Sequence, residues 1–159
     1  MNRRRLATHI AFLVLVVGGG LLIGATNTPD GWYASLAKPP FNPPNWIFGP
    51  VWTILYVAIA VAGARTWLRD RRGAAMTLWW GQLVLNFLWS PAFFTLHSIG
   101  GAMVVVTGMA VAVAAFIAAS WRHDRPAALL FVPYLAWVCF AGLLNGSILW
   151  LNGSPVAVQ

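Results

Sequence analysis

The chain has 159 residues, of which 60% are hydrophobic and only 8% charged, and its formal net charge is +7. Soluble domains carry about 25% charged residues, so 10 basic and 3 acidic side chains exclude a water-soluble surface and the outer face must contact lipid. The basic residues flank apolar segments, which is typical of membrane topology and not of nucleic-acid binding. A single cysteine, Cys139, excludes a disulfide framework within one chain, and no metal site or required cofactor is expected.

Five apolar segments are each about 20 residues long, the length that a membrane-spanning helix needs. They cover approximately residues 6–25, 46–68, 74–96, 100–121 and 126–151. The runs are too long for barrel strands and do not alternate in polarity. The sequence therefore predicts an all-α membrane protein, a five-transmembrane-helix bundle in one domain over residues 1–159. The first segment is longer than a signal-peptide core and no A-x-A site follows it, so we expect it to be retained.

Arginine placement predicts the orientation. The N-terminus carries Arg3, Arg4 and Arg5, and six further arginines fall in the second and fourth connections, whereas Lys38 alone lies on the other side. Because positive residues remain in the cytoplasm, this predicts a cytoplasmic N-terminus if the chain is inserted in a bacterial inner membrane.

The connection over residues 26–45 is long and rich in proline and aromatic residues. Prolines restrict the unfolded chain and so lower the entropy cost of ordering such a loop. Trp32 and its aromatic neighbours offer apolar area for docking on the bundle. Two interpretations stay open: a stiff linker with an interfacial aromatic belt, and a rigid lid over a cavity.

The third segment carries polar side chains near the middle of the bilayer. Gln82, Asn86 and Trp89 are spaced i, i+4 and i+7, so they share one helix face. Such groups are costly in lipid and face the bundle interior or a cavity. They serve either as hydrogen-bonding glue between helices or as ligand contacts.

Aromatic residues with small or polar neighbours recur in two other segments. Trp52 and Tyr56 are one turn apart in the second segment. In the fifth segment, residues spaced by four are Pro133, Trp137, Ala141 and Asn145. This combination suits a flat, largely apolar ligand with a few polar groups. Other tryptophans lie near segment ends and are expected to be interfacial anchors: Trp46, Trp67, Trp79, Trp121 and Trp150.

The sequence lacks the residues that several classes of function require. No segment holds an Asp, Glu, Lys or His at midplane depth, which disfavours ion-coupled transport and proton pumping. No phosphate-binding loop, nucleophile elbow or zinc-protease motif is present. The residues by themselves propose no enzyme mechanism.

Three motifs resemble the TspO/MBR family of tryptophan-rich sensory and translocator proteins: WYASLAKPPFNPPNWIFGPVWTILY, QLVLNFLWSPAFF and PYLAWVCFAGLLN. The resemblance covers about residues 8–152. It implies a dimeric five-helix bundle whose pocket binds porphyrins such as protoporphyrin IX, and synthetic isoquinoline carboxamides and benzodiazepines. The family's pocket residues fall on Trp32, Trp52, Asn86, Trp137 and Ala141, and the loop becomes a cap over a tetrapyrrole pocket.

One motif departs from the mammalian members. Their cholesterol motif at the end of the last helix needs a Tyr followed by Arg or Lys, whereas Gly146 occupies the Tyr position and no basic residue follows Arg125. We therefore expect weak sterol binding.

Four functions compete at this point. They are a porphyrin receptor that regulates tetrapyrrole metabolism or stress responses, a porphyrin transporter, a light-dependent porphyrin-degrading enzyme and an assembly protein without a ligand. The enzyme hypothesis names Trp52 and Trp137 as candidate redox residues. The transporter hypothesis is weakened because inverted repeats are absent from the sequence pattern.

Overall fold

The computed structural model describes residues 3–153, which are almost entirely helical and contain no strand. The first helical run consists of α1 (Arg3–Leu13), the π-helical turn η1 (Val14–Gly18) and α2 (Gly19–Thr26). It is followed by a short helix α3 (Gly31–Ser35) and by α4 (Asn45–Arg69). The chain continues with α5 (Ala74–Ser90), the π-helical turn η2 (Pro91–Thr95), α6 (Ile99–Ser120) and α7 (Arg125–Gly153).

Four of the described helical runs are long and apolar enough to cross a membrane: Arg3–Thr26, α4, α6 and α7. Helices are the expected form because their backbone groups are satisfied within the segment, as lipid requires. The predicted third span is different. Here α5 has 17 residues and includes Gln82 and Asn86, and the helix continues into η2. The all-α prediction is confirmed, and the count of five spanning helices is not.

Side chains at the helix starts explain where several elements begin. Ser98 Oγ accepts a hydrogen bond from Gly101 N at 3.2 Å at the start of α6. Asp124 Oδ1 accepts one from Ala127 N at 3.2 Å at the start of α7. The same Asp124 oxygen accepts a bond of 2.8 Å from Arg65 Nη2, which ties the end of α4 to the α6–α7 turn.

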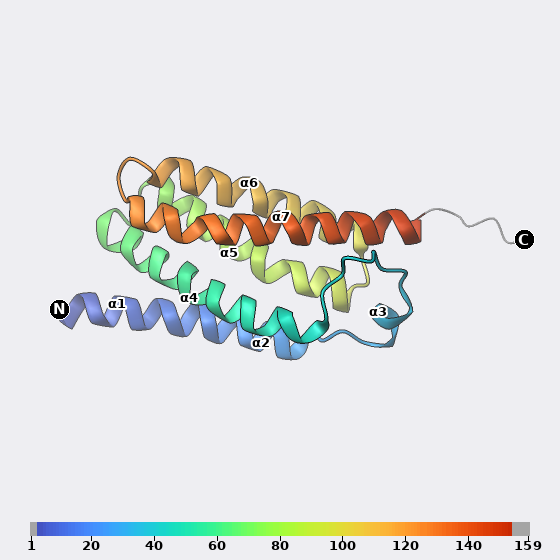
Figure 1. Cartoon of the computed structure of the whole chain (residues 1–159). Coiled ribbons are helices and arrows are strands. Elements are labelled where there is room, and N and C mark those ends of the chain that lie inside the picture. Colours follow the sequence, from blue (N-terminus) through green and yellow to red (C-terminus); the bar gives the residue numbers. More distant parts are fainter. Residues whose placement is uncertain (1–2, 154–159) are drawn as a thin grey trace, which may run out of the picture.

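The long helices lie side by side in one bundle (Figure 1). α6 packs on α5 and α7, and α4 packs on α1 and α7. The start of α1, the α4–α5 turn and the α6–α7 turn meet at one end of the bundle, while α3 lies at the other (Figure 1). The three arginine-rich regions are therefore at the same end, as the sequence predicted.

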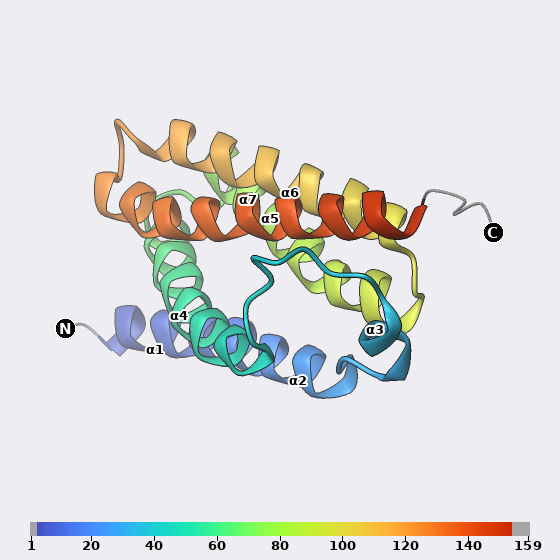
Figure 2. The same cartoon turned by 45° about the vertical axis from the view of Figure 1, so that its right-hand side comes forward.

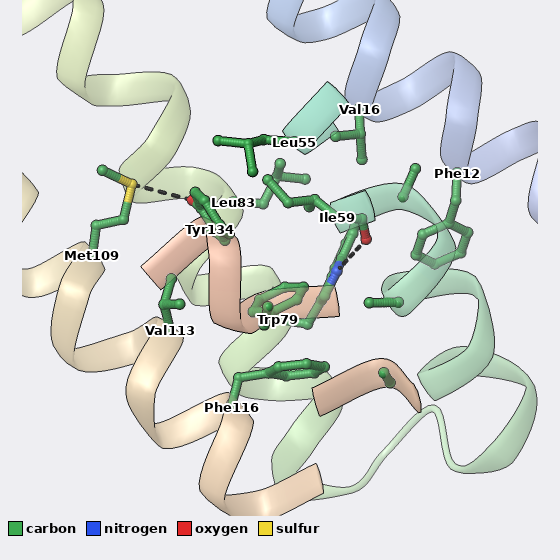
Figure 3. Packing of buried hydrophobic residues seen from close by; sticks show 14 of the residues in the cluster. Phe12, Val16, Leu55, Ile59, Trp79, Leu83, Met109, Val113, Phe116 and Tyr134 are labelled. Atoms are coloured by element: carbon green, nitrogen blue, oxygen red, sulfur yellow. Dashed lines mark hydrogen bonds between the residues drawn. The ribbon is translucent and has the colours of Figure 1, made fainter. Parts of the chain in front are cut away.

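Trp79 is at the centre of the core and not at a membrane interface. Its side chain is 0% exposed and its indole N–H donates a hydrogen bond to Ile59 O at 3.0 Å (Figure 3). Gly63 makes room for the ring, because a Cβ there would overlap the indole. The prediction of an interfacial anchor at Trp79 was wrong, since it rested on distance from the segment end and not on the helix face. Trp46 and Trp150 are strongly exposed, as predicted.

Candidate ligand-binding cavity

A cavity of about 540 Å³ opens inside the bundle at the end covered by the α2–α4 loop. Its walls come from α2, the loop, the first half of α4, the α5–η2 region, α6 and α7. The aromatic side chains in the wall are Tyr33, Phe48, Trp52, Tyr56, Trp89, Phe93 and Phe94. The amide side chains in the wall are Asn27, Asn42, Asn45, Asn86 and Asn145. Among the lining residues that the structure describes, none is charged, histidine or cysteine.

Five of the eight ligand-contact residues predicted from the sequence lie in this wall. They are Trp52, Tyr56, Asn86, Trp89 and Ala141. These residues come from α4, α5 and α7. The structure thus brings together, around one hollow, side chains that are up to 89 positions apart in the chain.

The other three predicted residues do not line the cavity. Gln82 is fully buried behind the wall. The Trp137 ring contacts the lining residue Phe48 edge-on at a centroid separation of 5.8 Å. Trp32 packs edge-on against Phe93, with the two ring centroids 5.8 Å apart. Any effect of these three residues on a ligand would pass through the side chains they support.

A tyrosine hydroxyl organises the polar part of the wall. Asn86 Nδ2 donates to the Tyr134 hydroxyl at 2.8 Å, and that hydroxyl donates to Gln82 Oε1 at 2.9 Å. Met109 Sδ lies 3.3 Å from the same hydroxyl (Figure 3). The network joins α5 to α6 and α7 and fixes the Asn86 side chain.

Several buried polar atoms of the lining residues have no hydrogen-bond partner. They are Asn42 Oδ1, Asn86 Oδ1, Trp89 Nε1 and Asn145 Oδ1. One hydrogen bond determines which way the Asn145 amide points. Its Nδ2 donates at 2.9 Å to Ile99 O, and a carbonyl oxygen can only accept. Buried polar groups are normally paired, so these atoms are suited to hydrogen bonds with a ligand.

One wall of the cavity is formed where α2 and α4 approach each other closely. Trp52 and Tyr56 stack on each other in α4 with centroids 5.3 Å apart. The Tyr56 ring lies directly against Gly20 of α2, where a Cβ would overlap it. Gly20 therefore lets α2 close this side of the cavity with a flat aromatic surface.

The α2–α4 loop is held down at its start and near its middle. Near the middle, the backbone of Ala37 exchanges two hydrogen bonds with the Asn152 side chain at the end of α7, at 3.0 and 2.9 Å. At the start of the loop the Thr95 hydroxyl donates to Asn27 Oδ1. The loop crosses the end of the bundle and runs alongside α7 (Figure 2). It is a docked cap, which favours the lid interpretation, and its helix α3 was not expected from the sequence.

A side-chain hydrogen bond and a ring stack hold α3 against the η2–α6 junction. Asp30 Oδ1 accepts the Tyr33 backbone N–H at 3.1 Å, and Asp30 Oδ2 lies 3.2 Å from His97 Nε2. The Trp32 ring stacks on the His97 ring at 4.2 Å. The hydrogen bond from Tyr33 N, with the contribution of His97, holds the pKa of Asp30 below its ordinary value of 3.8.

Loop docking is therefore expected to weaken in acid. Because the Asp30 pKa is lowered by folding, its contacts stabilise the docked loop above pH 3.8 and lose this effect as the pH falls below that value. At pH 6 we expect amide exchange of residues 27–44 to be several-fold slower in the wild type than in Asp30→Asn. At pH 3, after correction for intrinsic rates, the difference should be smaller than at pH 6; equal exchange at pH 6 would contradict this role of Asp30.

Tyr134 was missed as a site residue, although the sequence contained a signal for it. Buried residues of α7 alternate in steps of three and four, as Phe131, Tyr134 and Val138 illustrate. A strict spacing of four, which selected Trp137, turns away from that face by roughly 40° per step. The alternating spacing would have placed Tyr134 and Asn145 on the inner face together.

Comparison with known proteins decides the family. The sequence model of the TspO/MBR family matches residues 11–151, with the cavity-lining residues inside the matched range. The chain belongs to the TspO/MBR family. It is 38% identical to a tryptophan-rich protein TspO of Chlorobaculum tepidum over 96% of this chain and 99% of the relative.

Two further relatives show the breadth of the family. This TspO/MBR chain is 38% identical to a tryptophan-rich sensory protein of Cereibacter sphaeroides, over 92% of each chain. It is 39% identical to the translocator protein of Bos taurus, over 86% of this chain and 85% of the relative. Together with the long apolar helices, membership identifies an integral membrane protein of the sensor and translocator type.

Proposed function

We propose that this protein is a membrane receptor that binds porphyrins such as protoporphyrin IX, and other flat hydrophobic molecules, in the cavity beneath the α2–α4 loop. Binding would regulate tetrapyrrole metabolism or a stress response, in line with the sensory proteins among its relatives. The observation that carries the proposal is the aromatic, uncharged cavity beneath a docked cap.

The size and chemistry of the cavity support this ligand class. Its volume of about 540 Å³ lies within the range of roughly 300–1,000 Å³ found for small-molecule sites. Stacked pairs such as Trp52–Tyr56 and Trp89–Phe93 offer flat faces to a flat ring system. The unpartnered amide oxygens of Asn86 and Asn145 are candidate acceptors for a ligand in a wall that is mostly apolar.

The proposal includes the membrane arrangement. We infer that α5 together with η2 forms the fifth span, because it packs between the other spans and carries its polar residues inward. The arginine-rich end of the bundle would face the cytoplasm of a bacterial cell, which places the loop and cavity mouth on the outer side. A homodimer in the lipid bilayer is proposed as the working form, with weak sterol binding.

Light-dependent porphyrin degradation is the second candidate. Its specific support is Trp52, whose oxidisable indole lies in the cavity wall in stacking contact with Tyr56. Trp137 contacts the lining residue Phe48 but does not itself line the cavity, so it is a less direct redox partner for a bound ring.

A titration tests the receptor proposal. Protoporphyrin IX added to the purified protein in detergent should produce a saturable shift of its visible absorption that protein-free micelles do not show. Replacing Trp52 by leucine removes a stacking face and should weaken binding about tenfold, which corresponds to about 1.4 kcal/mol. Trp121→Leu is the matched control, because Trp121 lies at the opposite end of the bundle. A linear response, or equal affinity of both variants, would overturn the proposal.

A further inference from the structure

A second hollow lies in the loop itself, beside the cavity. It measures about 520 Å³ and is formed by residues between positions 29 and 45; we call it the vestibule. Four residues line both hollows: Pro29, Tyr33, Asn42 and Asn45. The two spaces therefore border one another, with the Tyr33 ring and the Asn42 amide in the shared wall.

The two hollows differ in charge. No charged side chain lines the cavity in the part of the chain that the structure describes, whereas Lys38 and Asp30 line the vestibule. The Asp30 carboxylate is already engaged, since one oxygen accepts the Tyr33 backbone N–H and the other pairs with His97. Lys38 is thus the charged group of the vestibule that remains for a ligand.

The Lys38 ammonium is positioned but not neutralised. Its Nζ donates to Leu36 O at 3.1 Å and to Ala34 O at 3.3 Å, and it lies 4.5 Å from the centroid of the Tyr33 ring. Among residues 3–153 no carboxylate lies within 4.0 Å of it. An ammonium has three donors, so two carbonyls leave one N–H and the full positive charge for an anion.

We propose that the vestibule is an anion subsite, in which Lys38 binds a carboxylate of a ligand whose apolar body occupies the cavity. The proposal rests on the proposed function for the body of the ligand and adds its orientation. The ligand class is a flat apolar molecule with carboxylates along one edge. The uncharged wall of the cavity accepts the apolar edge, because burying an unpaired carboxylate there would be costly, and the charged edge stays at the loop.

A matched pair of ligands tests this subsite. Protoporphyrin IX and its dimethyl ester share the macrocycle and differ at the two carboxyl groups, which are ionised in the acid and are neutral methyl esters in the ester. In the wild type we expect the acid to bind roughly five- to tenfold more tightly than the ester, the scale of one charge-assisted hydrogen bond at a partly exposed site. The preference should shrink as ionic strength rises, because salt screens such pairs.

Three variants separate the outcomes. Lys38→Gln should bind acid and ester equally, Lys38→Arg should retain the preference, and Arg69→Gln at the opposite end should behave as the wild type. Equal binding of both ligands by the wild type, or a preference that survives in Lys38→Gln, would overturn the subsite while leaving the receptor function standing. Failure of both ligands to bind saturably would instead reject the receptor function, and the subsite with it.

Discussion

Replacing Ala141 by phenylalanine is expected to weaken protoporphyrin IX binding about a hundredfold, equivalent to about 2.8 kcal/mol. Ala141 lies in the cavity wall on α7, level with the amides and rings that would contact the ligand. A phenyl group there would occupy space inside the 540 Å³ hollow. A flat rigid ligand cannot deform to share that space, so the loss should be larger than for removal of a single wall contact. Affinity is read from the same absorption titration in detergent.

The same substitution at Ala136 is the control. Ala136 is on α7 and exposed at the outer surface of the bundle, so a phenyl group there would contact lipid or detergent. Ala136→Phe should bind as the wild type does. If Ala141→Phe and Ala136→Phe bind equally well, the ligand does not enter the cavity.

Replacing Trp79 by alanine is expected to give the largest loss of stability in the chain. The ring is fully buried against Phe12, with centroids 5.0 Å apart, and its N–H bonds to Ile59 O. Removing a buried aromatic side chain costs about 3–5 kcal/mol. The lower end applies here, because lipid tails are as apolar as the side chain and the loss is chiefly one of packing. We therefore expect about 3 kcal/mol in reversible unfolding in mixed micelles.

Trp46→Ala provides the comparison for Trp79→Ala. Trp46 is 74% exposed at the start of α4, so its removal leaves no cavity and should change the unfolding free energy by less than about 1 kcal/mol. A Trp79 variant as stable as the Trp46 variant would show that the indole is not a central packing element.

Segment lengths were the most predictable part of the fold. The spans expected at 46–68, 100–121 and 126–151 correspond to α4 over 45–69, α6 over 99–120 and α7 over 125–153. The thickness of the bilayer sets the length of each apolar segment, and that length can be read from consecutive residues. The third expected span, 74–96, corresponds to α5 and η2 over 74–95, where α5 alone has 17 residues and is therefore shorter than the other long helices.

Contacts between distant segments were not predictable in the same way. α3 has only five residues and is held by the Asp30–His97 pair, which joins positions 67 apart. Isolated helices of that length are unstable, so no local pattern indicates it. The burial of Trp79 likewise depends on another segment, because its ring occupies space that Gly63 of α4 leaves free.

The candidate site was predicted where periodicity and depth agreed. Asn86, Trp89 and Ala141 were placed on inner faces by spacing, and they line the cavity. Trp137 was selected by the same rule but is not among the lining residues, and its ring contacts the lining residue Phe48. A single helix pattern identifies the inward face, but only the packed bundle determines which inward residue borders empty space.

Direct observation of the complex tests the central claim. The structure of the protein with bound protoporphyrin IX, determined by crystallography or electron microscopy, should show the macrocycle inside the cavity, against Trp52, Trp89 and Ala141. A macrocycle bound instead on the lipid-facing surface of the helices, with the cavity empty, would contradict the account.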